Sequence, residues 1–150
     1  MVADFIAAHF GGEVRFVADV AGGQGLLARE LTKRHGFEVE VIDPRPSKLV
    51  GVSRRPERFQ AGMADYYDLV VGLHPDEATT EIVQAATCRP AVLVLCCNFW
   101  RPERLGQEAL LRSIERFYAT SGVASARHRL DFKGPKNVAL VSRPGPHSLA

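Results

Sequence analysis

Apolar runs alternate with helix-like spacings along the first part of the chain. The run over residues 14–20 predicts a buried strand, and the leucines that follow give the spacing of a helix face, so a helix is expected over residues 24–35. Residues 38–42 predict a second strand, and a short amphipathic helix over residues 2–10 precedes the first one. Such alternation is typical of a parallel sheet covered by helices on both faces.

The pattern weakens in the middle of the chain and then returns. Prolines and basic side chains over residues 45–58 favour a loop with at most one turn of helix, and residues 59–62 predict a brief third strand. The apolar runs 68–73 and 91–97 predict two more buried strands, with a helix over 77–87 between them.

The last third of the chain predicts a helix over 105–120 and two strands, 124–132 and 138–142. The five residues between these strands leave no room for a crossover helix, so the strands must be antiparallel. The fold class expected is therefore α/β: a three-layer Rossmann-like sandwich around a mostly parallel seven-stranded sheet that ends in an antiparallel hairpin.

Composition limits the number of domains and the location of the protein but does not identify its partner. The 150 residues are expected to form a single domain, 1–150, and a net charge of +2 permits a nucleic-acid partner without arguing for one. Cys88, Cys96 and Cys97 lack the spacing of a disulfide framework, which favours a cytoplasmic location, and Cys96 is expected to be structural. Neither a targeting signal nor a membrane span is expected, and no metal site is expected.

A glycine-rich loop between the first strand and the first helix is the strongest chemical signal. The loop runs from Asp19 to Gly25, and Asp43 closes the second strand about twenty residues later. This arrangement cradles a nucleotide-like cofactor, because glycines let the backbone approach the ligand and an acid accepts hydrogen bonds from ribose. The same loop also satisfies a dinucleotide fingerprint, but Asp19 favours a ligand that carries an ammonium and a sulfonium over a pyrophosphate.

The loop is similar to the first motif of class I S-adenosyl-L-methionine (SAM) dependent methyltransferases, acid-x-Gly-x-Gly-x-Gly. Asp19, Gly23 and Gly25 match the motif, and Ala21 replaces its first glycine. The resemblance implies that SAM is the cofactor, that the loop holds the methionine part, that Asp43 holds the ribose and that an acid after the third strand holds the adenine. The cofactor-binding residues that it implies are Asp19, Ala21, Gly22, Gly23, Gly25, Asp43, Asp65 and Leu73.

The loop after the fourth strand is where such methyltransferases address the acceptor atom. His74 and Asp76 are the catalytic candidates there, His74 as a base whose ordinary pKa lies near neutrality. The alternative is that His74 only braces the turn. Leu73-His74-Pro75, Cys96-Cys97 and the segment 132–137 resemble a small group of methyltransferase-like domains and a tRNA ribose methyltransferase family, which favours RNA as the acceptor.

The expected function is SAM-dependent methyl transfer to an unidentified acceptor, with RNA, protein and small molecules as candidates. Two alternatives stay open: a catalytically inactive SAM-binding module of a complex, and a nucleotide-dependent oxidoreductase. Because the sequence contains no recognisable substrate domain, acceptor recognition is expected to fall to edge loops, to the second subunit of a homodimer or to a partner protein.

Overall fold

The computed structural model describes residues 2–47, 51–95, 100, 106–131 and 137–146. Seven strands form one sheet: β1 (Phe16–Val20), β2 (Glu38–Ile42), β3 (Ser53–Arg55), β4 (Leu69–Leu73), β5 (Ala91–Val94), β6 (Val123–Arg129) and β7 (Val138–Pro144). Four α-helices accompany them in the described residues: α1 (Val2–Phe10), α2 (Leu26–His35), α3 (Thr79–Ala85) and α4 (Gln107–Thr120). Two short 3-10 helices, η1 (Ala61–Tyr66) and η2 (Asp76–Ala78), flank β4.

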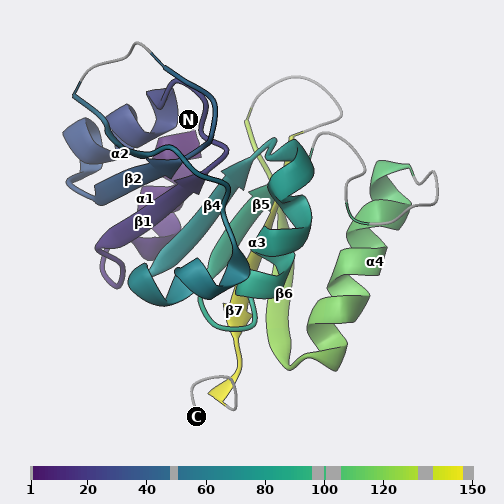
Figure 1. Ribbon diagram of the computed structural model, residues 1–150. Coiled ribbons are helices and arrows are strands. Elements are labelled where there is room, and N and C mark those ends of the chain that lie inside the picture. The colour runs from purple at the N-terminus through teal and green to yellow at the C-terminus, as the bar shows by residue number, and fades with distance from the viewer. Residues whose placement is uncertain (1, 48–50, 96–99, 101–105, 132–136, 147–150) are drawn as a thin grey trace.

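The sheet has the strand order β3-β2-β1-β4-β5-β7-β6, and only β7 runs antiparallel to its neighbours. Helices α1 and α2 cover one face, while α3 and α4 cover the other, so the molecule has three layers (Figure 1). Each face has its own cluster of buried apolar side chains. The predicted fold class and the predicted antiparallel pair at the end of the chain are confirmed.

The inner strands are apolar because both of their faces are covered. Every residue of β5 is buried, as are all of β1 except Phe16. Parallel strands in one sheet end at the same edge, so the loops after β1, β2 and β4 meet at the carboxyl edge of the sheet. The fold thereby brings together three loops that lie far apart in the sequence.

The predicted third strand is wrong. Residues 59–62 do not form a strand: Phe59 is buried as a loop residue, and η1 begins at Ala61. The strand β3 instead lies inside the segment that was expected to be a loop. It pairs only with β2, at the edge of the sheet. An edge strand can be as short as three residues, and its arginine side chains can reach solvent.

Smaller differences concern the ends of elements. The described part of β5 ends at Val94, and Cys96 and Cys97 lie outside the described residues, as does most of the segment 132–137. The helix expected over 77–87 is divided into η2 and α3. Among the helices in the described ranges, none is both long enough and apolar enough to cross a bilayer.

Candidate cofactor and acceptor site

The glycine-rich loop folds tightly between β1 and α2. Ala21, Gly23 and Gly25 all have positive φ angles, of 54°, 60° and 90°. Gly25 caps the amino end of α2 in this conformation, which glycine adopts without steric cost. At Ala21 the same conformation costs about 1 kcal/mol or more. The chain therefore keeps the path of the loop even where alanine replaces the first glycine of the motif.

Asp19 lies beneath the loop and is 1% exposed. Burial raises the pKa of its carboxyl to about 7, with the negative charge of Asp43 as a second cause, although the Ala28 amide and Arg54 act in the opposite direction. Its Oδ2 atom is buried without a hydrogen-bond partner. A buried acceptor without a partner is rare, and an ammonium group would satisfy it.

The raised pKa of Asp19 makes stability depend on pH. The ordinary value is 3.8, so between about pH 4 and pH 7 the folded protein holds a proton that the unfolded chain has lost, and stability falls as the pH rises through this window. From pH 5 to pH 8, we expect the free energy of unfolding in urea to fall by roughly 2 kcal/mol more in the wild type than in Asp19→Asn. Equal decreases in both proteins would contradict the raised pKa.

Asp43 lies at the end of β2 and is 1% exposed. Its Oδ2 accepts a hydrogen bond from the backbone N–H of Gly23 at 2.9 Å, so the strand end is tied to the glycine-rich loop. Burial by itself raises the pKa of Asp43, but hydrogen bonds from Arg45 and Gly23 outweigh it and bring the value to about 2. The carboxylate is therefore ionised at neutral pH and can only accept hydrogen bonds.

The loop after β4 also has an unusual backbone. His74 and Asp76 have φ angles of 52° and 51°, and with Ala21 they are the non-glycine residues of the described ranges that have positive φ. Such conformations are costly and concentrate at functional sites. The backbone N–H of His74 donates to the carbonyl of Val94 at 2.8 Å, which fixes the start of the loop, and the side chains of His74 and Asp76 are exposed.

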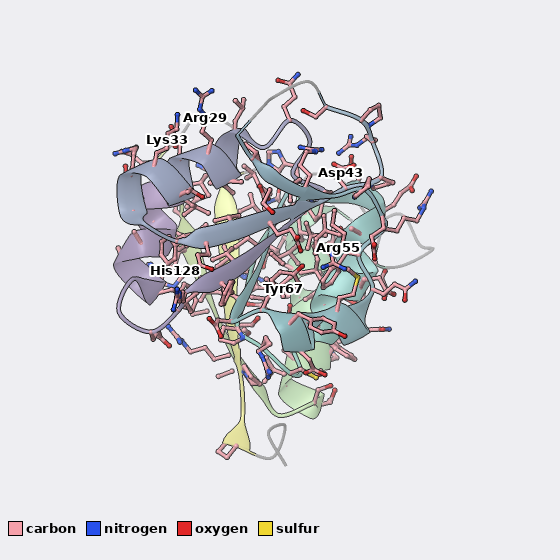
Figure 2. All side chains as sticks on the ribbon, turned by 60° about the vertical axis from the view of Figure 1, so that its left-hand side comes forward. Arg29, Lys33, Asp43, Arg55, Tyr67 and His128 are labelled. Carbon is pink, nitrogen blue, oxygen red and sulfur yellow. The ribbon has the colours of Figure 1, made fainter. Side chains whose placement is uncertain are left out.

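A cavity of about 360 Å³ lies at this carboxyl edge, between the ends of β1 and β2 and the loop after β4. Figure 2 shows Asp43 near that edge of the sheet. The residues that line the cavity are Val20, Ala21, Ile42, Asp43, Pro44, Arg45, Arg58, Phe59, Pro75, Asp76, Glu77, Ala78 and Glu81. The predicted residues Ala21, Asp43 and Asp76 thus meet in one cavity, with the rest of the glycine-rich loop beside it.

Other predicted residues lie away from this lining. Asp65 is in η1, where its carboxylate is 73% exposed and lies 3.8 Å from the guanidinium of Arg89. Leu73 packs against the core on the α1 and α2 side of the sheet. Neither residue lines the cavity, so the structure does not bring the acid proposed for adenine to the ribose acid.

Arginine side chains of the segment 45–58 were missed as site residues. Arg45 pairs with Asp43 at 2.7 Å, and Arg58 pairs with Glu77 at 3.2 Å, both within the cavity lining. Both side chains remain largely exposed to solvent, but their ion pairs with acids of the cavity were not expected. The one signal in the sequence is the position of Arg45 two residues after the strand-closing acid, where its N–H can form an Asx turn.

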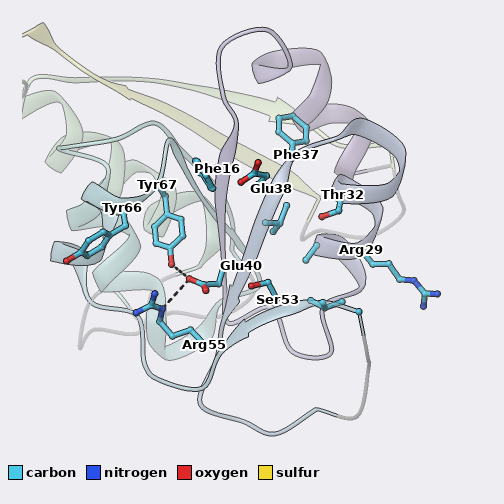
Figure 3. Close-up of a pocket in the computed structure, with 14 residues that line it drawn as sticks. Phe16, Arg29, Thr32, Phe37, Glu38, Glu40, Ser53, Arg55, Tyr66 and Tyr67 are labelled. Atoms are coloured by element: carbon cyan, nitrogen blue, oxygen red, sulfur yellow. Dashed lines mark hydrogen bonds and ion pairs between the residues drawn. The ribbon is translucent and has the colours of Figure 1, made fainter.

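A larger cavity, of about 480 Å³, lies beside β2 and β3 and contains none of the predicted site residues. In it Tyr67 donates a hydrogen bond to Glu40, which also pairs with Arg55 at 3.2 Å (Figure 3). Phe16 and Glu38, at the beginnings of β1 and β2, are also part of its lining, so it extends toward the amino ends of these strands. Ligands of open parallel sheets bind at the carboxyl ends, so the smaller cavity is the candidate site.

Metal ligation has no support in the described part of the chain, where no three His, Cys, Asp or Glu side chains gather in a suitable group. Cys88 is a partly buried free thiol. The chemically active groups that the described residues place at or beside the candidate site are carboxylates, an exposed histidine, arginines and the backbone of the loops.

Comparisons with known proteins identify the fold. No protein-family model matches the sequence, and no curated protein matches it. Among solved structures, the chain is similar to the 1,6-didemethyltoxoflavin-N1-methyltransferase of Burkholderia thailandensis, solved with S-adenosylhomocysteine bound, with a TM-score of 0.64, 14% identity, and 95% of this chain and 76% of that one covered.

Two other solved structures have comparable similarity. The ribosomal protein L11 methylase of Lactobacillus delbrueckii gives a TM-score of 0.63 at 14% identity, covering 96% of this chain and 77% of that one. The sugar N-methyltransferase KedS8 of a Streptoalloteichus species gives 0.60 at 14% identity, covering 96% and 85%. The chain therefore has the Rossmann-like fold of SAM-dependent methyltransferases.

Proposed function

We propose that the protein is a SAM-dependent methyltransferase whose cofactor binds across the carboxyl edge of β1 and β2. The observation that carries this proposal is the ionised, buried carboxylate of Asp43, which is tied to the glycine-rich loop and lines the cavity at that edge. A strand-closing acid in this position accepts hydrogen bonds from ribose hydroxyls. The shared fold and the similarity to the structures named above support the same class.

The residues present fit the cofactor at both of its polar ends. Asp43 would hold the ribose hydroxyls, while the loop from Ala21 to Gly25 would hold the methionine part. The Oδ2 of Asp19 lacks a partner, and the ammonium of the cofactor is a donor of the required charge. A pyrophosphate, in contrast, would meet the ionised carboxylate of Asp43 at this place. The cofactor would supply an electrophilic methyl group on a sulfonium.

On this proposal, the loop after β4 positions the acceptor. Transfer of a methyl group is an in-line displacement, so holding the acceptor atom in line contributes much of the rate. Asp76 lines the cavity, whereas His74 is not part of the lining and lies two residues before Asp76 with an exposed side chain. The positive φ angles of both residues fix the path of this loop. His74 would remove a proton where the acceptor must lose one, and Asp76 would bind a donor group of the acceptor. RNA, protein and small molecules all remain acceptor candidates.

Calorimetry with SAM, S-adenosylhomocysteine and NAD tests the cofactor class. We expect binding of the first two compounds and weaker or no binding of NAD. Tighter binding of NAD than of SAM would favour a nucleotide-dependent oxidoreductase instead. Labelled-methyl transfer to pools of RNA, protein and small molecules then identifies the acceptor class.

The variant His74→Ala separates catalysis from cofactor binding. We expect it to bind S-adenosylhomocysteine as the wild type does but to transfer methyl groups at least a hundredfold more slowly, because loss of a general base typically costs 10² to 10⁴ in rate. The measurement is the transfer rate to the pool that the wild type labels. If the wild type binds SAM but labels no pool, the chain is better described as an inactive SAM-binding module.

A further inference from the structure

Arg45 occupies hydrogen-bonding positions of Asp43 that a ribose contact needs. Its Nε donates to Oδ1 at 3.0 Å, and its Nη2 donates to Oδ2 at 2.7 Å. Two backbone amides, of Arg45 on Oδ1 and of Gly23 on Oδ2, complete the set, each at 2.9 Å. A carboxylate offers about four lone-pair sites, so all of them are in use.

The four donors differ in how easily they can leave. The two backbone amides belong to the loops that build the site, whereas the guanidinium lies at the end of a long side chain that is 64% exposed. If the guanidinium leaves, each oxygen of Asp43 keeps one backbone donor and regains one free site. The freed positions are therefore one on each oxygen, side by side.

A vicinal diol presents two hydroxyl donors on neighbouring carbons, and can give one to each oxygen of a carboxylate. The guanidinium fork of Arg45 makes the same two-donor contact from one planar group. The two groups are thus alternative partners for the same face of Asp43. They cannot occupy it together, because no lone pair of the carboxylate is left over.

We propose that the guanidinium of Arg45 takes the place of the ribose diol in the ligand-free protein and is displaced when an adenosine-bearing ligand binds. The inference rests on the proposed function, since it concerns the same ribose contact. Arg45 then reduces the affinity of the site for the ligand. Breaking the ion pair between Arg45 and Asp43 costs free energy, and this cost offsets part of the free energy gained from the ribose contact. The measured affinity is lower than that of the open site by the fraction of molecules in which Asp43 is free.

Other carboxylates near Arg45 can attract its guanidinium after displacement. Asp76 and Glu77 line the same cavity as Arg45, and their negative charges act on Arg45 at a distance. These charges still attract the guanidinium after it has left Asp43, which lowers the cost of the exchange, although Glu77 is shared with Arg58. These acids belong to the loop after β4, where the acceptor is proposed to bind.

Calorimetry with SAM, S-adenosylhomocysteine and 5′-methylthioadenosine tests the exchange, because all three compounds have the ribose diol and the last lacks the amino-acid part. We expect Arg45→Met to bind each of them about tenfold more tightly than the wild type, because no ion pair must be broken. Arg45→Lys keeps the charge but not the fork, and we expect it to lie between the two. Arg55→Met is the matched control: it removes an arginine that also pairs with a carboxylate, Glu40, but lies outside this cavity, and we expect a change below twofold.

The outcomes separate this inference from the proposed function. If the wild type binds these compounds and Arg45→Met binds them equally or more weakly, Arg45 does not compete with ribose and the inference fails alone. An equal gain in Arg55→Met would assign the effect to net charge and would also overturn it. If neither the wild type nor Arg45→Met binds any of the three compounds, the proposed function itself fails.

Discussion

Asp43→Ala is expected to weaken the binding of S-adenosylhomocysteine by about 1–3 kcal/mol, roughly fivefold to more than a hundredfold. The substitution removes the acceptor for the ribose hydroxyls, which then lose their partner in a partly buried site. It also removes the acceptor of the Gly23 amide, which ties the glycine-rich loop to β2. Both losses weaken the same site, and isothermal calorimetry measures their sum.

Asp65→Ala is the control for this experiment. Asp65 carries the same charge but is exposed and lies beside Arg89 rather than in the cavity. Its replacement is expected to leave the affinity unchanged within twofold. That result would also mean that Asp65 does not bind the adenine, the role that the family resemblance implies for it. Unchanged affinity in Asp43→Ala would mean that the cofactor does not contact the end of β2. Asp43→Asn, which preserves the volume and one acceptor, should lie between these results.

The fold was predictable because parallel strands that are buried on both faces consist mostly of consecutive apolar residues. β4 and β5 are such runs, and β1 is one apart from Asp19, whereas β2 alternates glutamate with valine before Ile42. The short connection before β7 admits only antiparallel pairing. β3 was not predictable in this way. It is an edge strand of three residues, Ser-Arg-Arg, whose side chains do not need to be apolar because it pairs on one side only.

The site was predictable to the level of motifs but not of contacts. Spacing located Asp19, the glycines and Asp43, since a strand, a tight turn and a helix constrain where each can lie. The pairing of Arg45 with Asp43 depends on rotamers and on the path of the following loop, which no spacing rule contains. The position of Asp65 in η1, outside the cavity lining, could not be predicted either, because the third strand was expected at the wrong residues.

Gly22→Ala is expected to cost about 1–3 kcal/mol of stability and to weaken cofactor binding, because the position has no room for a side chain. A Cβ atom added at Gly22 would lie 2.5 Å from Oδ2 and 2.6 Å from Cγ of Asp19. Asp19 is a short, buried side chain held by the Ala28 amide, so it cannot move aside freely. The loop must shift instead, and the loop is the part proposed to hold the methionine end of the cofactor.

The matched control is Gly62→Ala, since a Cβ atom at Gly62 has no heavy atom within 4 Å and the residue is outside the left-handed region. Urea denaturation should separate the two variants. A double variant then tests the cause: in an Asp19→Ala background the contact is absent, so Gly22→Ala should cost much less than in the wild type. If its cost is the same in both backgrounds, the loss comes from the loop backbone rather than from the carboxylate beneath it, and the close packing of Asp19 under Gly22 does not limit this position.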